Sequence, residues 1–161
     1  MKRIYKHYVV NVIRKKPKAT WKDYGSLMKT IAISGYFDPL HVGHLEYIEL
    51  AADLGDHLTV IVNNDYQCKL KKGKSFMPED DRVRIIQALA VVDTTFLSID
   101  LDSSVCESLS IIKPNIFANG GDRKLGEIPE TRVMKEHGIM MVDGLGNKIR
   151  SSSELTGINA K

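Results

Sequence analysis

Two histidines three residues apart are the side chains of this sequence best suited to chemistry. Residues 35–44 read Gly-Tyr-Phe-Asp-Pro-Leu-His-Val-Gly-His and directly follow a short apolar run. His41 and His44 point the same way if a helix begins here, and the first turn of a helix attracts anions. Gly35 and Gly43 let the backbone turn off a strand and approach a ligand closely. The segment therefore predicts binding of a polyphosphate whose oxygens gain charge during a reaction.

The same two histidines have other interpretations. They could cap the helix, pack in the core or bind zinc. Zinc requires further ligands, and Cys68 and Cys106 do not have the spacing of a zinc site. Because the whole ten-residue segment follows a predicted strand, we favour the phosphate interpretation.

A lysine-rich segment is the second candidate for chemistry. Residues 69–75 read Lys-Leu-Lys-Lys-Gly-Lys-Ser. We expect a mobile loop in which Lys71 or Lys72 neutralises a leaving pyrophosphate, and the alternative is a solvated surface loop. The last three residues imitate a P-loop, but the first glycine of that motif falls on Cys68, so Walker-type ATP binding is excluded.

These candidate residues need a scaffold that brings the ends of strands together. Short apolar runs alternate with segments of helical spacing along the chain. We expect strands at residues 30–34, 57–63, 94–99, 115–118 and 139–142. We expect helices at 44–54, from Pro78, from Asp102 to about Ile112, at about 129–137 and from about Ser151. This order predicts an α/β fold, a Rossmann-like parallel five-stranded sheet with helices on both faces, whose ligands bind beyond the carboxyl ends of the strands.

Length, composition and cysteine content restrict the class of protein. The 161 residues suit one domain, and a content of 43% hydrophobic residues excludes a disordered chain. The sequence has no apolar run of the roughly 18–20 residues that a membrane span needs, and it does not open with a signal peptide. Two cysteines form no disulfide framework, so we expect a cytoplasmic protein without a membrane partner.

The first 28 residues differ from the rest, so we divide the chain into a basic N-terminal extension, 1–28, and a domain, 29–161. Residues 1–30 contain nine Lys or Arg and one acid, whereas the remainder has 14 basic and 19 acidic residues. A nucleic-acid arm is one interpretation of this asymmetry. We favour a solvated extension that packs on the domain or on a second subunit, and we do not expect a nucleic-acid partner.

The segment 35–44 resembles the signature G-x-F-D-x-x-H-x-G-H of the cytidylyltransferase-like nucleotidyltransferases, a family with the HIGH-superfamily fold. The likeness covers about residues 30–155. The most similar subgroup is the heptose-phosphate adenylyltransferase domain, through residues 62–65, 90–93 and 120–122, and glycerol-3-phosphate cytidylyltransferase is next. The resemblance implies transfer of a nucleotidyl group from a nucleoside triphosphate, ATP before CTP, to a phosphorylated sugar or polyol. Pyrophosphate leaves without a covalent enzyme intermediate, Mg²⁺ is the expected cofactor, and a homodimer is an expected assembly.

The resemblance also implies roles for individual residues. His41 and His44 would contact the triphosphate and stabilise the transition state, with Lys71 or Lys72 of the lysine-rich segment as further catalytic residues. Asp38 would organise its loop. We expect no direct protein ligands to Mg²⁺, and the alternative is a contact from Asp38. The expected nucleotide-binding residues are Gly35, Tyr36, Phe37, Asp38, Gly43, Gly121, Asp122, Arg150, Ser151, Ser152 and Ser153.

Two of these assignments have structural alternatives. Arg82 lies where relatives have an arginine near the acceptor, and a surface salt bridge is the alternative. Ser151 and Glu154 fit a capping box, which alone explains both residues, whereas relatives bind the β- and γ-phosphates with a serine- and threonine-rich segment here.

The sequence departs from the family pattern at a few positions. Arg150 replaces a small or apolar residue, and Gly146 stands where some relatives have an arginine, a charge that Lys148 or Arg150 would supply instead. Asn119 stands where the heptose subgroup usually has lysine. This last difference concerns the acceptor more than the reaction.

Two other functions are alternatives to catalysis of nucleotidyl transfer. One is a nucleotide-binding or nucleic-acid-associated module without turnover, tethered through residues 1–28. The other is a fragment of a class I aminoacyl-tRNA synthetase, which has a similar histidine motif. The chain is too short for the tRNA-binding parts of such an enzyme, and Lys71–Ser75 comes too early to be the lysine loop that forms the second signature of those enzymes.

Overall fold

A computed structural model describes residues 28–120, 128–146 and 152–157 of the chain. Among these residues no helix is long and apolar enough to cross a membrane. The described residues form five strands and six helices, in the order β1 (Thr30–Gly35), α1 (Val42–Ala52), β2 (His57–Val62), α2 (Asp65–Lys72), α3 (Glu79–Gln87), β3 (Thr94–Leu97), α4 (Cys106–Ile112), β4 (Ile116–Gly120), α5 (Thr131–His137), β5 (Met140–Leu145) and α6 (Ser152–Thr156).

The strands form one parallel sheet in the order β3-β2-β1-β4-β5. The first strand is central, with Gly35 opposite Val62 of β2 and Ile33 opposite Ala118 of β4. The chain therefore extends the sheet from β1 first in one direction and then in the other. The point where the order reverses lies between β1 and β4, and ligands of such sheets bind outside the carboxyl ends of the strands at this point. The predicted Rossmann-like α/β fold is confirmed.

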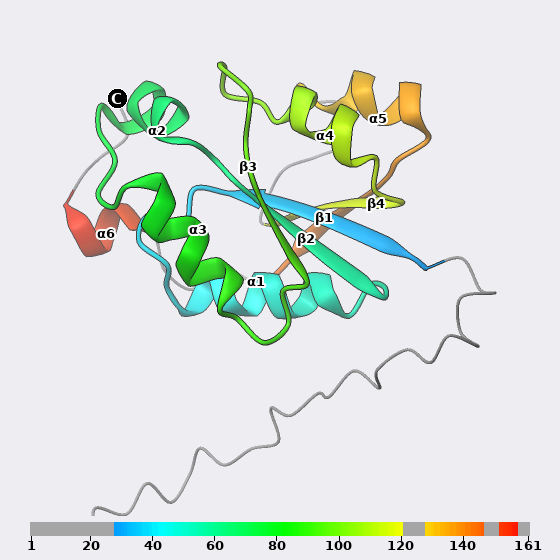
Figure 1. Cartoon of the computed structure of the whole chain (residues 1–161), viewed down its shortest axis with the longest axis horizontal. Helices are drawn as coiled ribbons and strands as arrows, with labels where there is room; N and C mark the ends of the chain where they lie inside the picture. Colours follow the sequence, from blue (N-terminus) through cyan, green and yellow to red (C-terminus); the bar gives the residue numbers. More distant parts are fainter. Residues whose placement is uncertain (1–27, 121–127, 147–151, 158–161) are drawn as a thin grey trace, which may run out of the picture.

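Helices cover both faces of the sheet (Figure 1). On one face α1 and α3 pack over the strands, in a core made of Ile31, Ile33, Ile48, Ala51, Leu58, Val60, Val62, Ile86, Ile116 and Ala118 with their neighbours. On the other face α4 and α5 cover a second core, which contains Ala32, Ile61, Val105, Leu109, Phe117 and Met134. Successive residues of a strand belong to opposite cores, as the alternation of a strand requires. Helices α2 and α6 lie at the end of the sheet where β1 and β2 end (Figure 1).

The lysine-rich segment is the last turn of a helix, and our expectation of a mobile loop is wrong for Lys69 to Lys72. Helix α2 begins with a capping box, in which Asn64 and Gln67 each accept a hydrogen bond from the backbone N–H of the other. It ends at Gly73, whose φ of 85° lies in the left-handed region that glycine adopts readily. The lysines therefore occupy defined positions at the C-terminus of α2, where cations are favoured.

Helix α4 begins at Cys106, later than the predicted start at Asp102, and Asp100 contacts its first turn. The Asp100 carboxylate accepts the backbone N–H of Glu107 at 2.7 Å and that of Ser108 at 3.1 Å. Asp102 instead accepts the N–H of Ser104, before the helix. Asp100 is 2% exposed, so a buried acid satisfies this helix start from the loop that follows β3.

Candidate functional site

The loop after β1 is built around a buried phenylalanine. Phe37 is 1% exposed and has a φ of 49°, which is uncommon for a residue with a side chain. Its ring packs back against the end of β1, where a Cβ on Gly35 would lie 2.6 Å from the Phe37 Cζ. The absence of a side chain at Gly35 is therefore a packing requirement of this loop. The ring also contacts His44 edge to face, with centroids 5.1 Å apart.

The two histidines hold each other at the start of α1. His41 is the N-cap and its Nδ1 accepts the backbone N–H of His44 at 3.4 Å, while the Nδ1 of His44 accepts the backbone N–H of His41 at 3.3 Å. The rings stack, with centroids 3.7 Å apart and planes 17° apart. Because each Nδ1 accepts a hydrogen bond, each neutral ring carries its proton on Nε2. Capping and ligand binding are thus compatible, since one nitrogen caps the helix and the other is a donor.

The environment of His44 keeps its ring neutral. Burial lowers the pKa of His44 from its usual 6.5 to about 3, and the nearby His41 and Lys72 contribute to the same shift. A neutral imidazole with a proton on Nε2 is a hydrogen-bond donor that does not lose this role between pH 5 and 8. Such a donor at a helix N-terminus suits the oxygens of a phosphate group.

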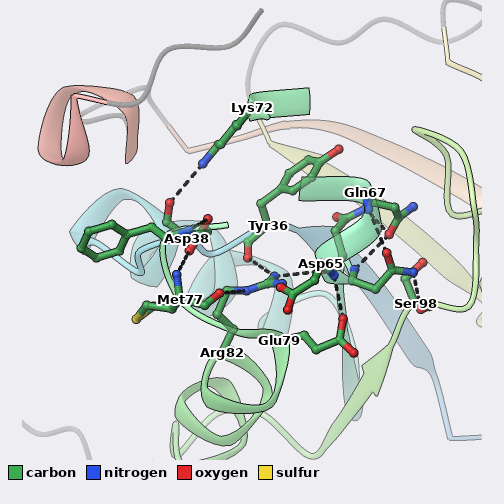
Figure 2. Close-up of polar contacts among 12 residues, drawn as sticks. Tyr36, Asp38, Asp65, Gln67, Lys72, Met77, Glu79, Arg82 and Ser98 are labelled. Atoms are coloured by element: carbon green, nitrogen blue, oxygen red, sulfur yellow. Dashed lines mark hydrogen bonds and ion pairs between the residues drawn. The ribbon is translucent and has the colours of Figure 1, made fainter. Parts of the chain in front are cut away.

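Side chains from α2 and α6 meet the same loop (Figure 2 shows the α2 side). Lys72 donates from Nζ to the Asp38 carbonyl at 3.0 Å, and the Nζ of Lys71 lies 4.3 Å from the centre of the Tyr36 ring. From the other side, Ser152 at the start of α6 donates from Oγ to the Pro39 carbonyl at 3.0 Å. Segments more than 30 and more than 110 residues apart in the sequence therefore converge on the loop that carries the histidines.

Asp38 has a structural role in this loop. Its side chain is 1% exposed, and its two carboxylate oxygens accept the backbone N–H groups of Phe76 and Met77 at 2.8 and 2.7 Å. The expectation that Asp38 organises the loop agrees with this geometry. A Mg²⁺ contact does not fit, because that ion needs exposed oxygen ligands and usually keeps several waters. Among the described residues no group of three or more His, Cys, Asp or Glu side chains is arranged to hold a metal ion.

Arg82 corrects our prediction most clearly. Its side chain has no exposed surface, which leaves no part of it open to an acceptor or to a salt bridge on the surface. The guanidinium donates to three backbone carbonyls, those of Tyr36, Asn63 and Met77, at 2.8, 2.6 and 3.0 Å. It also pairs with Asp65 at 2.7 Å.

The partners of Arg82 come from the loops that follow β1 and β2 and from the segment before α3 (Figure 2). The residue acts as a buried connection beneath the site. A guanidinium suits this task because its five N–H donors have a fixed, planar arrangement.

One contact that sequence reasoning missed holds α1 to the neighbouring strand end. The hydroxyl of Tyr47 donates to the Ala118 carbonyl at 2.8 Å. A Cβ on Gly120 would lie 3.1 Å from the Tyr47 ring and 3.3 Å from the Leu145 carbonyl, so a side chain here would require these neighbours to shift by a few tenths of an ångström. The only signal in the sequence is that Tyr47 follows His44 by three residues, on an adjacent turn of α1.

The remaining predicted site residues divide into two groups. Gly43 lies in the first turn of α1, and Ser153 lies in the first turn of α6. Four predicted site residues lie outside the described part of the chain: Gly121, Asp122, Arg150 and Ser151, which is also the N-cap of the predicted capping box. Residues 1–27 of the predicted extension 1–28 lie outside it as well. The structure therefore brings together the histidine loop, the two lysines of α2 and Ser152.

A parallel sheet whose first strand leads into a helix that begins with two histidines defines an α/β protein with a Rossmann-like fold, in which ligands bind at the carboxyl ends of the strands. The sequence profile of the cytidylyltransferase-like family matches residues 32–153. The chain belongs to this family and is a nucleotidyltransferase.

Relatives of this chain include two kinds of enzyme. It is 35% identical over 132 residues to a FAD synthase of Methanoculleus marisnigri, an alignment that covers 80% of this chain and 87% of that protein. It is 34% identical over 122 residues to the bifunctional protein HldE of Nitratiruptor sp., covering 74% of this chain but only 26% of that protein. A crystal structure of a lipopolysaccharide core biosynthesis protein from Thermoplasma volcanium superposes with a TM-score of 0.62 and 27% identity, over 75% of this chain and 99% of the other.

Proposed function

We propose that this protein is an adenylyltransferase that transfers AMP from ATP to the phosphate of a phosphorylated sugar or polyol and releases pyrophosphate. The observation that carries the proposal is the histidine pair, whose Nδ1 atoms both accept hydrogen bonds of the helix cap. This arrangement puts the proton of each ring on Nε2, which can then donate to a phosphate oxygen. Their position supports the proposal, because they lie beyond the carboxyl end of β1, and α/β sheets bind ligands beyond the carboxyl ends of their strands.

The chemistry follows from the position and charge of these groups. An oxygen of the acceptor phosphate attacks the α-phosphorus of ATP, and the bond from that phosphorus to the bridging oxygen breaks, with its electron pair leaving on pyrophosphate. His41 and His44 donate to oxygens that gain charge, and Lys71 and Lys72 add positive charge on the same side. The protein does not need a covalent intermediate, because positioning and electrostatic stabilisation account for the catalysis.

The relatives support ATP as the donor. FAD consists of an adenylyl group joined to FMN, so a FAD synthase product contains the AMP unit that this reaction transfers. FMN carries its phosphate on a ribityl chain, which makes it a polyol phosphate, and the acceptors of the two kinds of relative thus share a phosphate monoester. For the same protein we propose a cytoplasmic location, in keeping with its free cysteines Cys68 and Cys106, and a homodimeric assembly.

The test is pyrophosphate release by the purified full chain. Each of ATP, CTP, GTP and UTP is combined, as its Mg²⁺ complex, with FMN, a heptose phosphate or glycerol 3-phosphate. We expect ATP to support release with at least one acceptor and not without it. A preference for CTP contradicts the adenylyl assignment, whereas absence of release in every combination favours a binding module without turnover.

A further inference from the structure

A buried amide near the end of β4 has no hydrogen-bond partner among the residues that the structure describes. Asn119 is 5% exposed, and within residues 28–120, 128–146 and 152–157 nothing accepts a hydrogen bond from its Nδ2. Buried polar groups of folded proteins nearly always have a partner, because a donor removed from water without one is costly. A bound ligand is a natural source of the missing acceptor, since Asn119 lies at the carboxyl end of a strand beside the switch point of the sheet.

The side chain of Asn119 is on the α4 and α5 face of the sheet. Ala118 belongs to the core under α1, and a side chain on Gly120 would meet Tyr47 of α1. Phe117 belongs to the core under α4 and α5, so alternation places Asn119 on that face as well. Phe117 is paired with Ala32 of β1, and the next side chains along this face are those of Asn119 and Ser34, two polar groups at the end of an apolar surface.

The histidines approach the site from the opposite layer. They belong to the N-terminus of α1, which covers the other face of the sheet. In an in-line displacement the attacking oxygen and the leaving oxygen lie on opposite sides of the phosphorus. If the leaving pyrophosphate is bound at the start of α1, the acceptor enters from the side of α4 and α5, where Asn119 is.

We therefore propose that Asn119 is a specificity-determining residue, whose Nδ2 donates a hydrogen bond to a phosphate oxygen of the acceptor. The proposal rests on the proposed function and names the side of the site from which the acceptor binds. A neutral amide recognises an oxygen by direction rather than by charge, so it orients the acceptor phosphate without neutralising it. A dianionic phosphate thus keeps the negative charge that makes it a nucleophile.

Steady-state kinetics of Asn119→Ala and Asn119→Asp test this role. The acceptor is whichever of FMN, a heptose phosphate and glycerol 3-phosphate gives the wild type its highest kcat/KM. We expect the acceptor KM of Asn119→Ala to rise about 10- to 100-fold, the usual effect of removing a hydrogen bond to a charged group. The rise is larger for Asn119→Asp, because a carboxylate of the same shape repels the phosphate. The KM for ATP stays within about threefold of the wild-type value.

Thr95 offers a matched control. Its Oγ1 is likewise buried without a partner in the described part of the chain, but it lies in β3, away from the switch point. Thr95→Val should leave both KM values unchanged. Asn119→Asp keeps the size of the native residue and decides the question if Asn119→Ala does not fold.

Three outcomes overturn the inference. An unchanged acceptor KM in both Asn119 variants shows that the amide does not contact the acceptor. A rise confined to the KM for ATP assigns Asn119 to the nucleotide instead. The third outcome is a wild-type protein that releases no pyrophosphate with any acceptor, which overturns the proposed function and this inference with it. It differs from the first two outcomes because the wild type itself is inactive.

Discussion

His44 uses its two ring nitrogens for different tasks, which allows them to be separated by mutation. Its Nδ1 accepts the backbone N–H of His41, and its Nε2 is the group that we propose donates to a phosphate. In His44→Asn the amide oxygen can replace Nδ1, but nothing replaces Nε2. We expect kcat for pyrophosphate release to fall about 10²- to 10³-fold, as when one transition-state donor is lost. The midpoint of thermal unfolding should change little.

His44→Ala removes both nitrogens and provides the comparison. Its kcat should fall to a similar level, and its free energy of unfolding should also fall, by about 0.5–2 kcal/mol for the lost cap interaction. Near-normal turnover by His44→Asn would show that the ring is a helix cap and nothing more.

The depressed pKa of His44 also predicts how stability depends on pH. The folded protein binds a proton at His44 only near pH 3, whereas the unfolded chain binds one near pH 6.5. Between these values the unfolded state holds the extra proton, so the contribution of His44 to stability is complete above pH 6.5 and is lost as the pH falls toward 3. Urea unfolding at pH 7.5 and pH 5 should show a larger loss for the wild type than for His44→Asn. Equal losses would mean that His44 is accessible to protons in the folded protein.

At the scale of elements, Arg82 joins the loops after β1 and β2 to the segment before α3, and it does so together with the contacts of Asp38. Arg82→Met leaves the carbonyls of Tyr36 and Asn63 without their donor and Asp65 without its ion pair. We expect a loss of at least about 3 kcal/mol in the free energy of unfolding, measured by urea denaturation, because the partners of a buried charge become uncompensated.

Arg84 is the matched control on the same helix. It is exposed, so Arg84→Met should change stability by no more than about 0.5 kcal/mol. If both variants lose the same small amount, Arg82 does not hold the loops together.

Elements whose apolar residues have a clear period could be predicted from the sequence, and α2 could not. A short apolar run that stops at a glycine or a polar residue predicts a buried strand, and β1, which ends at Gly35, is an example. Helix α2 has no apolar face, since Leu70 is exposed and Gln67 is buried. It is stabilised by its capping box and by the bonds from Gln67 Nε2 to the carbonyls of Asp102 and Ser104. Those partners are some 35 residues away, so local periodicity does not indicate them.

The same reasoning explains what could be predicted of the site. The convergence of His41 and His44 follows from a spacing of three residues at a helix start, which is local information. The burial of Arg82 depends on carbonyl groups that every residue possesses, so residue types carry no sign of it. The contact of Asp100 with the start of α4 could not be predicted either, because both Asp100 and Asp102 are close enough in the sequence to reach the first turn of the helix.

At the scale of the whole molecule, the nucleotide that binds most tightly should stabilise the folded protein most. A ligand at 100 times its dissociation constant adds about 2.7 kcal/mol to the free energy of unfolding. We expect ATP to raise the thermal midpoint of the full chain more than CTP, GTP or UTP at equal concentration. His44→Asn, which lacks the Nε2 donor that we propose binds phosphate, should show a smaller shift with ATP than the wild type. A larger shift with CTP would contradict the adenylyl assignment.

The separation of the two helix layers has a consequence for how such a protein can diversify. Helix α1, with the histidines, packs in one core, and α4 and α5 pack in the other, so the two layers share only the sheet. Substitutions beneath α4 and α5 can therefore accumulate without rebuilding the packing that holds α1. A lineage could in this way exchange one metabolite for another while inheriting its energy-rich co-substrate unchanged.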